Sequence, residues 1–332
     1  MSDKCLKKVF ITGGAGFLAK TICKKLIEQG VEVHSYSRKN HPELHSMGVI
    51  CHQGDLADYD VLLKSIPEHI DCVFHTAALT DMWGKYETFY KTNVLGTQNI
   101  LKAIAEKKIY HLIYTSTPSV VFNENDLFGV NENEITYPEK FLSYYAQTKS
   151  IAERMVLRAN CVPFYTCALR PHLIWGPNDP SIRPRLIQMA LKKRLKIIGR
   201  GQNLVDVTYC ENAANAHLLA AYELMNHKKN AGKAYFLGDE KPVELWPFIY
   251  ELLGKDYQQY FSFKKKIPTS LAYFIGYILE KYYQWNKIYH KWPMLTRFAV
   301  LQMSKSHYFS HKKAQEDFNY QPIQVSPSQV IL

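Results

Sequence analysis

A short apolar segment at residues 8–12 leads directly into a cluster of glycines, Thr12-Gly13-Gly14-Ala15-Gly16-Phe17-Leu18. Glycines let the backbone turn sharply and approach a pyrophosphate, and the helix that follows presents free N–H groups to it. Because the cluster follows the first predicted strand of the chain, it indicates a dinucleotide-binding turn rather than a plain tight turn. We expect the cofactor to contact Gly13, Gly14, Ala15, Gly16, Phe17 and Leu18.

The sequence around and after this cluster alternates short β-rich segments with helical patterns. Strands are predicted at residues 8–12, 32–37, 49–53, 72–76, 111–116 and 164–169, and helices at 16–29, 87–107 and 143–160. This alternation is typical of a parallel sheet that helices cover on both faces. The predicted fold class is therefore α/β, a Rossmann-type doubly wound parallel sheet with a smaller, irregular C-terminal substrate lobe.

Beyond Gly176 the alternation weakens, and the pattern predicts a helix at 184–193 and a short strand at 195–198. A strand at 205–207 and a helix at 211–223 are expected to return to the first layer. The sequence from about 241 is aromatic-rich and irregular. We expect the dinucleotide-binding Rossmann domain to comprise 1–176 plus about 203–225, and the substrate-binding lobe 177–202 and about 233–332.

The end of the second predicted strand carries Ser37, Arg38 and Lys39, where an acidic residue would bind the adenosine ribose hydroxyls of NAD. A serine followed by two cations suits a 2′-phosphate instead. The segment therefore favours NADP(H) over NAD(H). The alternative is a solvated basic loop that does not discriminate between the two cofactors.

Two further segments follow predicted strands and supply cofactor contacts. Asp55 and Leu56 follow the third strand, where a carboxylate can meet the adenine amino group; an N-cap for a helix at 58–65 is the alternative. Ala77 and Ala78 follow the fourth strand and are small enough to let the cofactor lie close. We expect all four to line the cofactor.

Tyr145 and Lys149 lie four residues apart in a predicted helix and therefore project from one face. An ammonium beside a phenol stabilises the phenolate, so we expect Lys149 to lower the Tyr145 pKa from about 10 toward neutrality. Tyr145 can then donate a proton to a carbonyl oxygen as hydride arrives, or remove one in the reverse reaction. The spacing predicts a catalytic pair that also contacts the cofactor, with Tyr144 assigned to packing.

The fifth predicted strand ends in hydroxyl residues that could hold the reacting oxygen beside Tyr145. Thr117 is the first candidate and Ser116 the alternative, although either could simply cap the strand end. Asn93 is a poor helix former in the middle of a predicted helix. Its amide is expected to bridge backbone groups or water near Lys149, as structural support for the site.

The formal net charge of +11 favours anionic partners, such as a dinucleotide phosphate, an acidic substrate or an acidic membrane surface. The basic residues form no nucleic-acid recognition module, so no nucleic-acid partner is expected. The seven cysteines contain no C-x-x-C pair and indicate buried thiols in a reducing compartment rather than disulfides or a metal site. No bound metal is expected. Because no signal peptide and no apolar run of about 18 residues is present, we expect a cytoplasmic protein.

Residues 268–285 are apolar, aromatic and flanked by lysines. A peripheral membrane helix fits this pattern, as does a lid over an apolar acyl or sterol substrate, and core packing is the third alternative. An apolar substrate with an acidic group, such as a β-keto fatty acid, would suit both the aromatic lobe and the positive charge.

Taken together, these motifs resemble those of the extended short-chain dehydrogenases/reductases, and within them the 3β-hydroxysteroid dehydrogenase branch. The matching segments are T-G-G-A-G-F at 12–17, G-D-L at 54–56, N-V-x-G-T at 93–97, Y-x-x-x-K at 145–149 and L-R-P-x-x-I-W-G-P at 169–177. The bacterial reductases of 2-alkyl-3-ketoalkanoic acids are similar in Y-T-S-T-P-S-V at 114–120, W-G-P-N-D-P at 175–180 and V-D-x-T-Y-x-x-N-A-A-x-A-H at 205–217. The chain departs from the family pattern at Ala19, in place of the last glycine, and at Thr117, where many relatives carry serine.

The resemblance implies an NADP(H)-dependent oxidoreductase that interconverts a hydroxyl and a ketone on an apolar substrate, by reduction of a long-chain 2-alkyl-3-ketoacid. It also implies that Pro171, His172 and Ile174 line the nicotinamide, with Arg185 and 206–209 at the cleft between the lobes. A homodimer would form through the helices at 87–107 and 143–160.

Three alternatives remain. A 3β-hydroxysteroid or sterol dehydrogenase differs in substrate and direction, and the apolar lobe argues against a nucleotide-sugar epimerase. An NADP-binding sensor or scaffold without catalysis is the alternative of another class, and the presence of both Tyr145 and Lys149 argues against it.

Overall fold

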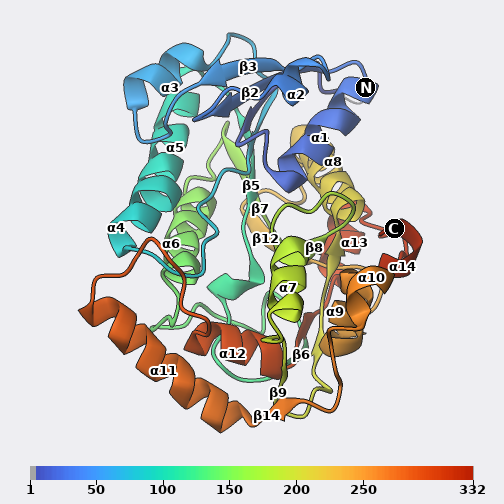
Figure 1. The fold of residues 1–332 in the computed structure, drawn as a ribbon. Coiled ribbons are helices and arrows are strands. Elements are labelled where there is room, and N and C mark those ends of the chain that lie inside the picture. The colour runs from blue at the N-terminus through green and yellow to red at the C-terminus, as the bar shows by residue number, and fades with distance from the viewer. Residues whose placement is uncertain (1–4, 332) are drawn as a thin grey trace.

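A computed structural model describes residues 5–331 and contains a seven-stranded parallel sheet in the order β12-β7-β5-β4-β1-β2-β3 (Figure 1). The predicted α/β, doubly wound fold class is confirmed. From β1 the chain adds β2 and β3 on one side of the sheet, and it then adds β4, β5, β7 and β12 on the other side. Parallel sheets of this kind bind ligands at the point between β1 and β4 where this change occurs. The strands are β1 (Lys8–Thr12), β2 (Glu32–Ser37), β3 (Ile50–Gln53), β4 (Cys72–His75), β5 (His111–Thr115), β7 (Tyr165–Pro171) and β12 (Lys233–Leu237).

Helices cover both faces of this sheet because its strands are apolar on both faces. Val9 and Ile11 of β1 pack with one layer of helices, whereas Phe10 between them points to the other layer, and all three side chains are fully buried. The first layer contains α1 (Phe17–Glu28), α2 (Pro42–His45), α8 (Cys210–Asn226) and α13 (Lys312–Phe318). The second layer contains α3 (Tyr59–Ser65), α5 (Gly96–Glu106) and α6 (Tyr144–Arg158).

The helix predicted at 87–107 is in fact three consecutive segments. It begins as α4 (Tyr86–Phe89), widens into a π-helical segment (Tyr90–Leu95) and continues as α5. π-Helical turns are uncommon and recur at functional sites. Here the wide segment carries Asn93, which is buried.

The second part of the molecule lies below the central sheet in Figure 1. It contains a four-stranded sheet in the order β13-β10-β15-β6 and the two-stranded pairs β11-β8 and β14-β9. Its strands are β6 (Leu127–Val130), β8 (Ile174–Trp175), β9 (Ile197–Ile198), β10 (Leu204–Val205), β11 (Thr208–Tyr209), β13 (Val243–Glu244), β14 (Lys266–Ile267) and β15 (His307–Phe309). Its helices are a 3₁₀ turn (Pro118–Val120), α7 (Ile182–Leu191), α9 (Leu245–Leu253), α10 (Lys255–Gln258), α11 (Thr269–Trp285), α12 (Arg297–Ser304) and α14 (Pro327–Val330).

Four segments differ from the sequence-based expectation. Strand β6 lies within the predicted domain 1–176 but pairs with β15 of the second part, and α13 lies within the predicted lobe but packs on the first layer. The lobe was expected to begin at about 233, yet Lys233–Leu237 is the edge strand β12 of the central sheet and pairs with β7. The strand expected at 205–207 does not join the first layer, because Leu204–Val205 pairs with β13 and β15 instead. The helix expected at 211–223 is α8 and does pack on the first layer. The division into two functional domains stays a prediction.

Candidate active site

The turn between β1 and α1 has the close packing that its glycines permit. Gly13 has a positive φ of 71°, and the Gly16 N–H donates to the Gly13 carbonyl over 2.8 Å. A Cβ atom on Gly14 would lie 2.2 Å from Oγ of Ser35, and one on Gly13 would lie 2.9 Å from Cα of Ala77. Neither glycine can gain a side chain without displacing its neighbours.

The first turn of α1 fits an anion such as a pyrophosphate. The N-cap residue is Gly16, which has no side chain to cap the helix N–H groups, and the first turn contains no acidic residue. Free N–H groups and the positive end of the helix dipole attract negative charge. Ala15 and Phe17 are partly exposed, whereas the Leu18 side chain is buried in the core, so a cofactor would meet Leu18 through its backbone.

The end of β2 offers a hydroxyl and two cations. Ser37 is partly exposed, and its hydroxyl donates to the Lys39 carbonyl over 2.8 Å. The side chains of Arg38 and Lys39 are exposed. This set suits a phosphate ester better than a neutral ribose hydroxyl pair, because phosphate oxygens accept charge-assisted hydrogen bonds.

Asp55 lies at the end of β3 beside an exposed lysine. Its Oδ1 accepts from the Ala57 N–H over 3.0 Å, and its Oδ2 lies 3.2 Å from Nζ of Lys91. The Ala57 hydrogen bond lowers the pKa of Asp55, and Lys91 contributes further. The alternative that Asp55 caps the next helix is wrong, because the N-cap of α3 is Asp58, which accepts from the Val61 N–H.

A buried chain of hydrogen bonds runs from the phosphate turn to Asn93. Thr12 Oγ1 lies 2.7 Å from Nδ1 of His75, whose Nε2 lies 2.9 Å from Oγ1 of Thr97, and Thr97 donates to the Asn93 carbonyl over 2.6 Å. Burial lowers the pKa of His75 to about 3, so the ring is neutral and one nitrogen donates while the other accepts. Sequence reasoning missed His75; a histidine closing an otherwise apolar strand was the available signal.

Asn93 joins the loop after β4 to helix α6. Its Oδ1 accepts from the Leu79 N–H over 2.7 Å, and its Nδ2 donates to the Leu79 carbonyl and to Oγ1 of Thr148. Residues 77–78, both partly exposed, precede Leu79, and Lys149 follows Thr148. The amide therefore bridges backbone groups, as expected, and it links the predicted cofactor wall to the predicted catalytic helix.

Tyr145 and Lys149 lie on successive turns of α6, beside the end of β5. Nζ of Lys149 donates to the Thr115 carbonyl over 2.6 Å and lies 4.0 Å from the centre of the Tyr114 ring. Lys149 is buried, whereas Tyr145 is partly exposed. The ring of Tyr144 contacts the aromatic residues of α4 and not this group.

The pKa values of this pair differ from the expectation. Burial raises the pKa of Tyr145 to about 12, and a hydrogen bond with Thr117 opposes that rise in part. Burial lowers the pKa of Lys149 from 10.5 to about 7, against the opposing charge of Glu153. The expected lowering of the Tyr145 pKa is therefore wrong in this structure, because desolvation of the phenol dominates and the amine is directed at Thr115. At neutral pH Tyr145 keeps its proton.

The hydroxyls of Thr117 and Ser116 face different partners. Thr117 meets Tyr145, and its Oγ1 also donates to Oγ of Ser119 over 3.2 Å. Ser116 is buried and faces Glu153, whose pKa it helps to lower. Of the two alternatives that the sequence left open, the geometry favours Thr117 as the hydroxyl beside the phenol.

A buried ion pair that sequence reasoning missed lies one turn beyond Lys149. Arg170 donates to Glu153 through Nη2 over 2.6 Å and through Nε over 2.9 Å, and the Tyr137 hydroxyl donates to the same carboxylate over 2.6 Å. Burial raises the pKa of Glu153, but the Arg170 charge and these hydrogen bonds outweigh it and lower the pKa overall. The signal was present, since Glu153 continues the four-residue spacing of Tyr145 and Lys149.

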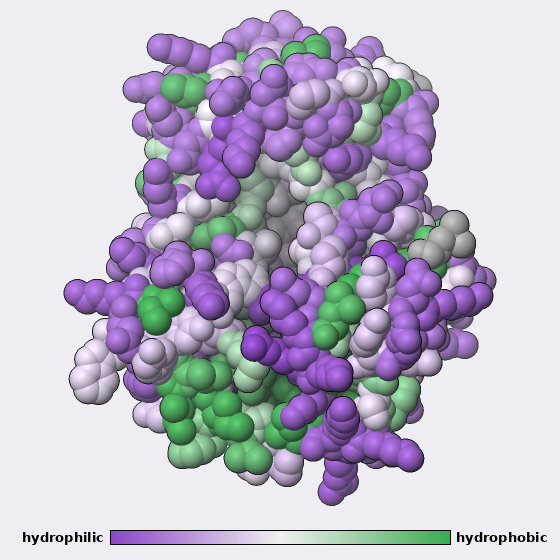
Figure 2. Space-filling model, in the orientation of Figure 1, coloured by the Kyte–Doolittle hydropathy of each residue, from purple (hydrophilic) through white to green (hydrophobic). Residues whose placement is uncertain are grey.

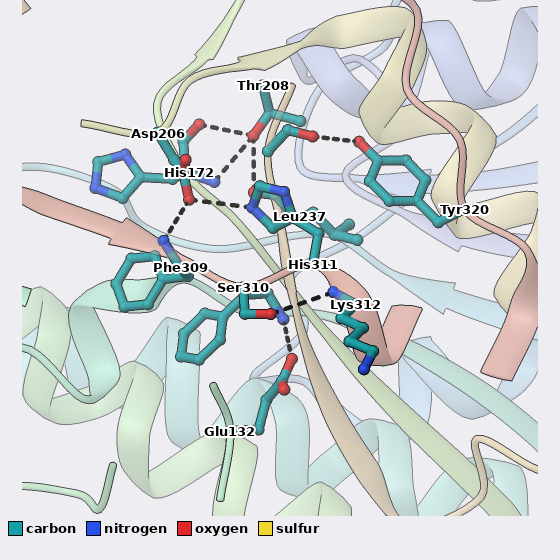
Figure 3. A network of polar contacts seen from close by, with 12 residues as sticks. Glu132, His172, Asp206, Thr208, Leu237, Phe309, Ser310, His311, Lys312 and Tyr320 are labelled. Atoms are coloured by element: carbon teal, nitrogen blue, oxygen red, sulfur yellow. Dashed lines mark hydrogen bonds and ion pairs between the residues drawn. The ribbon is translucent and has the colours of Figure 1, made fainter. Parts of the chain in front are cut away.

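The loop after β7 lies at the boundary between the central sheet and the second part. Pro171 ends β7, and the ring of His172 stacks on His307 with 4.7 Å between centroids. The His172 N–H donates to Oγ1 of Thr208, which donates back to the His172 carbonyl over 2.8 Å (Figure 3). Burial lowers the pKa of His172 well below 6.5, so the ring is neutral, and Ile174 beyond it is partly exposed.

Asp206 contacts the end of β15 and the segment that follows it at this boundary. Its Oδ2 accepts from the Phe309 N–H over 2.8 Å and lies 3.1 Å from Nε2 of His311, as Figure 3 shows. Figure 2 shows a hollow across the middle of the molecule, between the upper half with the central sheet and the lower half. Thr208, two residues beyond Asp206, donates to the carbonyl of Leu237 at the end of β12 over 3.1 Å and so links this segment to the central sheet.

Comparisons with known proteins place the chain among related enzymes. The model of the 3-beta hydroxysteroid dehydrogenase/isomerase family matches residues 10–264. The chain is 41% identical to the 2-alkyl-3-oxoalkanoate reductase of Shewanella oneidensis, over 94% of this chain and 81% of that protein. It is 34% identical to the decarboxylating sterol-4-alpha-carboxylate 3-dehydrogenase of Mus musculus, over 96% of this chain and 87% of that protein. A solved UDP-glucose 4-epimerase has the same fold, with a TM-score of 0.72, 21% identity and coverage of 98% of this chain and 95% of that one.

Proposed function

The chain belongs to the 3-beta hydroxysteroid dehydrogenase/isomerase family, and from this premise we propose that it reduces the ketone of a long-chain 2-alkyl-3-ketoacid with NADPH. It is an oxidoreductase of the CH–OH/ketone class, and its fold is that of enzymes that use a nicotinamide cofactor. The observation that carries the proposal is the hydrogen bond of Tyr145 with Thr117 beside the end of β5, where Lys149, one turn further along α6, donates to the Thr115 carbonyl.

The proton for the reduction comes from Tyr145, while bound NADPH supplies the hydride. Because the pKa of Tyr145 is raised to about 12, the phenol holds its proton at neutral pH and can donate it to the carbonyl oxygen. The Thr117 hydroxyl holds that oxygen beside the phenol. For Lys149 to stabilise the phenolate that remains after proton transfer, its amine has to be protonated and to turn from the Thr115 carbonyl toward Tyr145.

The cofactor would bind along the carboxyl edge of the central sheet. The first turn of α1 would receive the pyrophosphate, and Ser37, Arg38 and Lys39 would receive a 2′-phosphate, which supports NADP(H) over NAD(H). Asp55 would meet the adenine amino group. The remaining contacts would come from Leu56, Ala77, Ala78, Pro171, His172 and Ile174.

An acidic, apolar substrate is supported by the surroundings of Arg185. Its guanidinium lies 4.0 Å above the Trp292 ring, and Met82, Trp83 and Trp292 line a narrow recess beside it. Arg185 would bind a carboxylate while the aromatic side chains contact an acyl chain. The relative from Mus musculus, whose name also specifies a carboxylate, supports a sterol acid as the second candidate substrate.

The test is NADPH consumption with a panel of 2-alkyl-3-ketoacids and 3-ketosteroids. Removing the phenolic hydroxyl in Tyr145→Phe should lower kcat by roughly 10²–10⁴-fold, the usual contribution of a positioned general acid. Tyr144→Phe is the matched control and should retain wild-type turnover, because its ring contacts α4. Turnover of ketosteroids alone would favour the second candidate. Tight NADPH binding without turnover of any ketone would contradict the proposal.

A further inference from the structure

The outer face of α11 is apolar along most of its length and also carries the exposed Lys281. The helix spans 17 residues, and Phe274 and Trp285 on this face are 59% and 90% exposed. Side chains three or four positions apart share one face of a helix. The exposed apolar side chains of α11 are Leu271, Phe274, Tyr277, Ile278, Tyr282 and Trp285. Figure 2 shows this patch at the lower left, where Figure 1 shows α11.

The inner face of α11 is held firmly against α12. Ala272 and Gly276 are placed there, and a Cβ atom on Gly276 would lie 3.0 Å from the backbone nitrogen of Arg297. Glu280 accepts from the backbone N–H and from Nε of Arg297, both over 2.7 Å. Core packing therefore accounts for the inner face alone. The exposed face has no covering segment among residues 5–331.

The surface next to the patch is strongly basic. Exposed lysines precede α11 at 264–266, and β14 pairs there with β9, which follows the basic segment 192–196. Residues 192–200 contain no acidic side chain. Within 255–291 the acidic residues are Asp256 and Glu280, and the latter is buried in its pair with Arg297. The basic side chains are Lys192, Lys193, Arg194, Lys196, Lys264, Lys265, Lys266, Lys281 and Lys287.

We propose that the outer face of α11, with these cations, binds an anionic phospholipid bilayer as a peripheral surface. A helix with aromatic and aliphatic side chains on one face and lysines around it lies in the plane of a membrane interface. The cations attract acidic headgroups, which favours a membrane over an uncharged protein partner. Within residues 5–331 no helix is both long and apolar enough to cross a bilayer, so the contact runs along the surface. A protein bound in this way would take up an apolar substrate directly from the bilayer in which that substrate is dissolved.

The test is sedimentation of the wild-type chain with vesicles of phosphatidylcholine alone, or of phosphatidylcholine with about one-third phosphatidylglycerol. Wild type should bind the anionic vesicles at least about tenfold more tightly than vesicles of phosphatidylcholine alone. Its affinity for the anionic vesicles should fall as the salt concentration rises. Phe274→Asp should weaken this binding by about tenfold or more, since it places a charge in the apolar face. Lys264→Glu/Lys265→Glu should weaken it by a similar factor for anionic vesicles only.

Matched control variants lie at the amino edge of the central sheet. Tyr110 is 43% exposed just before β5, and Lys228 and Lys229 are an exposed lysine pair between α8 and β12. Tyr110→Asp and Lys228→Glu/Lys229→Glu should bind vesicles as wild type does. Thermal unfolding by circular dichroism verifies that every variant is folded.

Three outcomes would overturn the proposal. Wild type could fail to bind either vesicle, or bind both equally. Alternatively, sedimentation could reveal a wild-type dimer that Phe274→Asp dissociates, which would assign the face to a second copy of the chain. None of these readouts depends on turnover, so they are independent of the proposed reaction.

Discussion

Replacing Lys149 by methionine should make the folded protein more stable near neutral pH while it removes activity. Burial lowers the pKa of Lys149 from 10.5 to about 7. Since a tenfold change in proton affinity is about 1.4 kcal/mol, this residue costs the folded state ~4 kcal/mol at pH 7. Between pH 7 and 10.5 the unfolded chain binds more protons than the folded one, so wild-type stability rises with pH across that window. From pH 7 to pH 9 the expected rise is about 2 kcal/mol.

The substitution also removes the hydrogen bond to the Thr115 carbonyl, which costs about 1 kcal/mol at every pH. The pH-dependent part therefore isolates the ionisation of Lys149, because all other titrating groups are common to both proteins. Urea unfolding at pH 7 and pH 9 measures it. The advantage of Lys149→Met over wild type should shrink by about 2 kcal/mol at the higher pH. An advantage of the same size at both pH values would show that the pKa of Lys149 is not lowered in the folded protein.

Three other substitutions test the site. Arg170→Met leaves the Glu153 carboxylate buried without its partner and should cost about 3–5 kcal/mol in urea unfolding, part of which Arg170→Met/Glu153→Gln recovers; equal stability of the single and double variants would contradict this. Gly14→Ala places a Cβ atom 2.2 Å from Oγ of Ser35 and should lower stability by about 1–3 kcal/mol and weaken NADPH binding, and an unchanged thermal midpoint would rule out the close contact. Ser37→Asp places a carboxylate beside the 2′-phosphate of NADPH. The KM for NADPH divided by the KM for NADH should therefore rise by on the order of thirtyfold, which corresponds to about 2 kcal/mol of binding free energy. A constant ratio would show that Ser37 does not face the phosphate.

Local rules were sufficient for much of the fold. Strands β1 and β2 lie where the alternation of apolar segments predicted them, and the glycine turn connects β1 to α1 as expected. The spacing of Tyr145 and Lys149 predicted their shared face, because helix geometry acts within four residues. Local pattern did not find β12, since the short apolar segment 233–237 contains nothing that specifies which sheet it joins.

The order of the elements, the phosphate turn and the pairing of the tyrosine with the lysine can be predicted from the sequence, because each depends on residues close together in the chain. The tertiary structure alone decided which strand-end hydroxyl meets Tyr145, and it alone showed the contact of Glu153 with Arg170, 17 positions away. It also decided the direction of the Tyr145 and Lys149 pKa shifts. Those shifts follow from desolvation, and water is excluded from α6 by segments that are distant in sequence and meet only when the chain is folded.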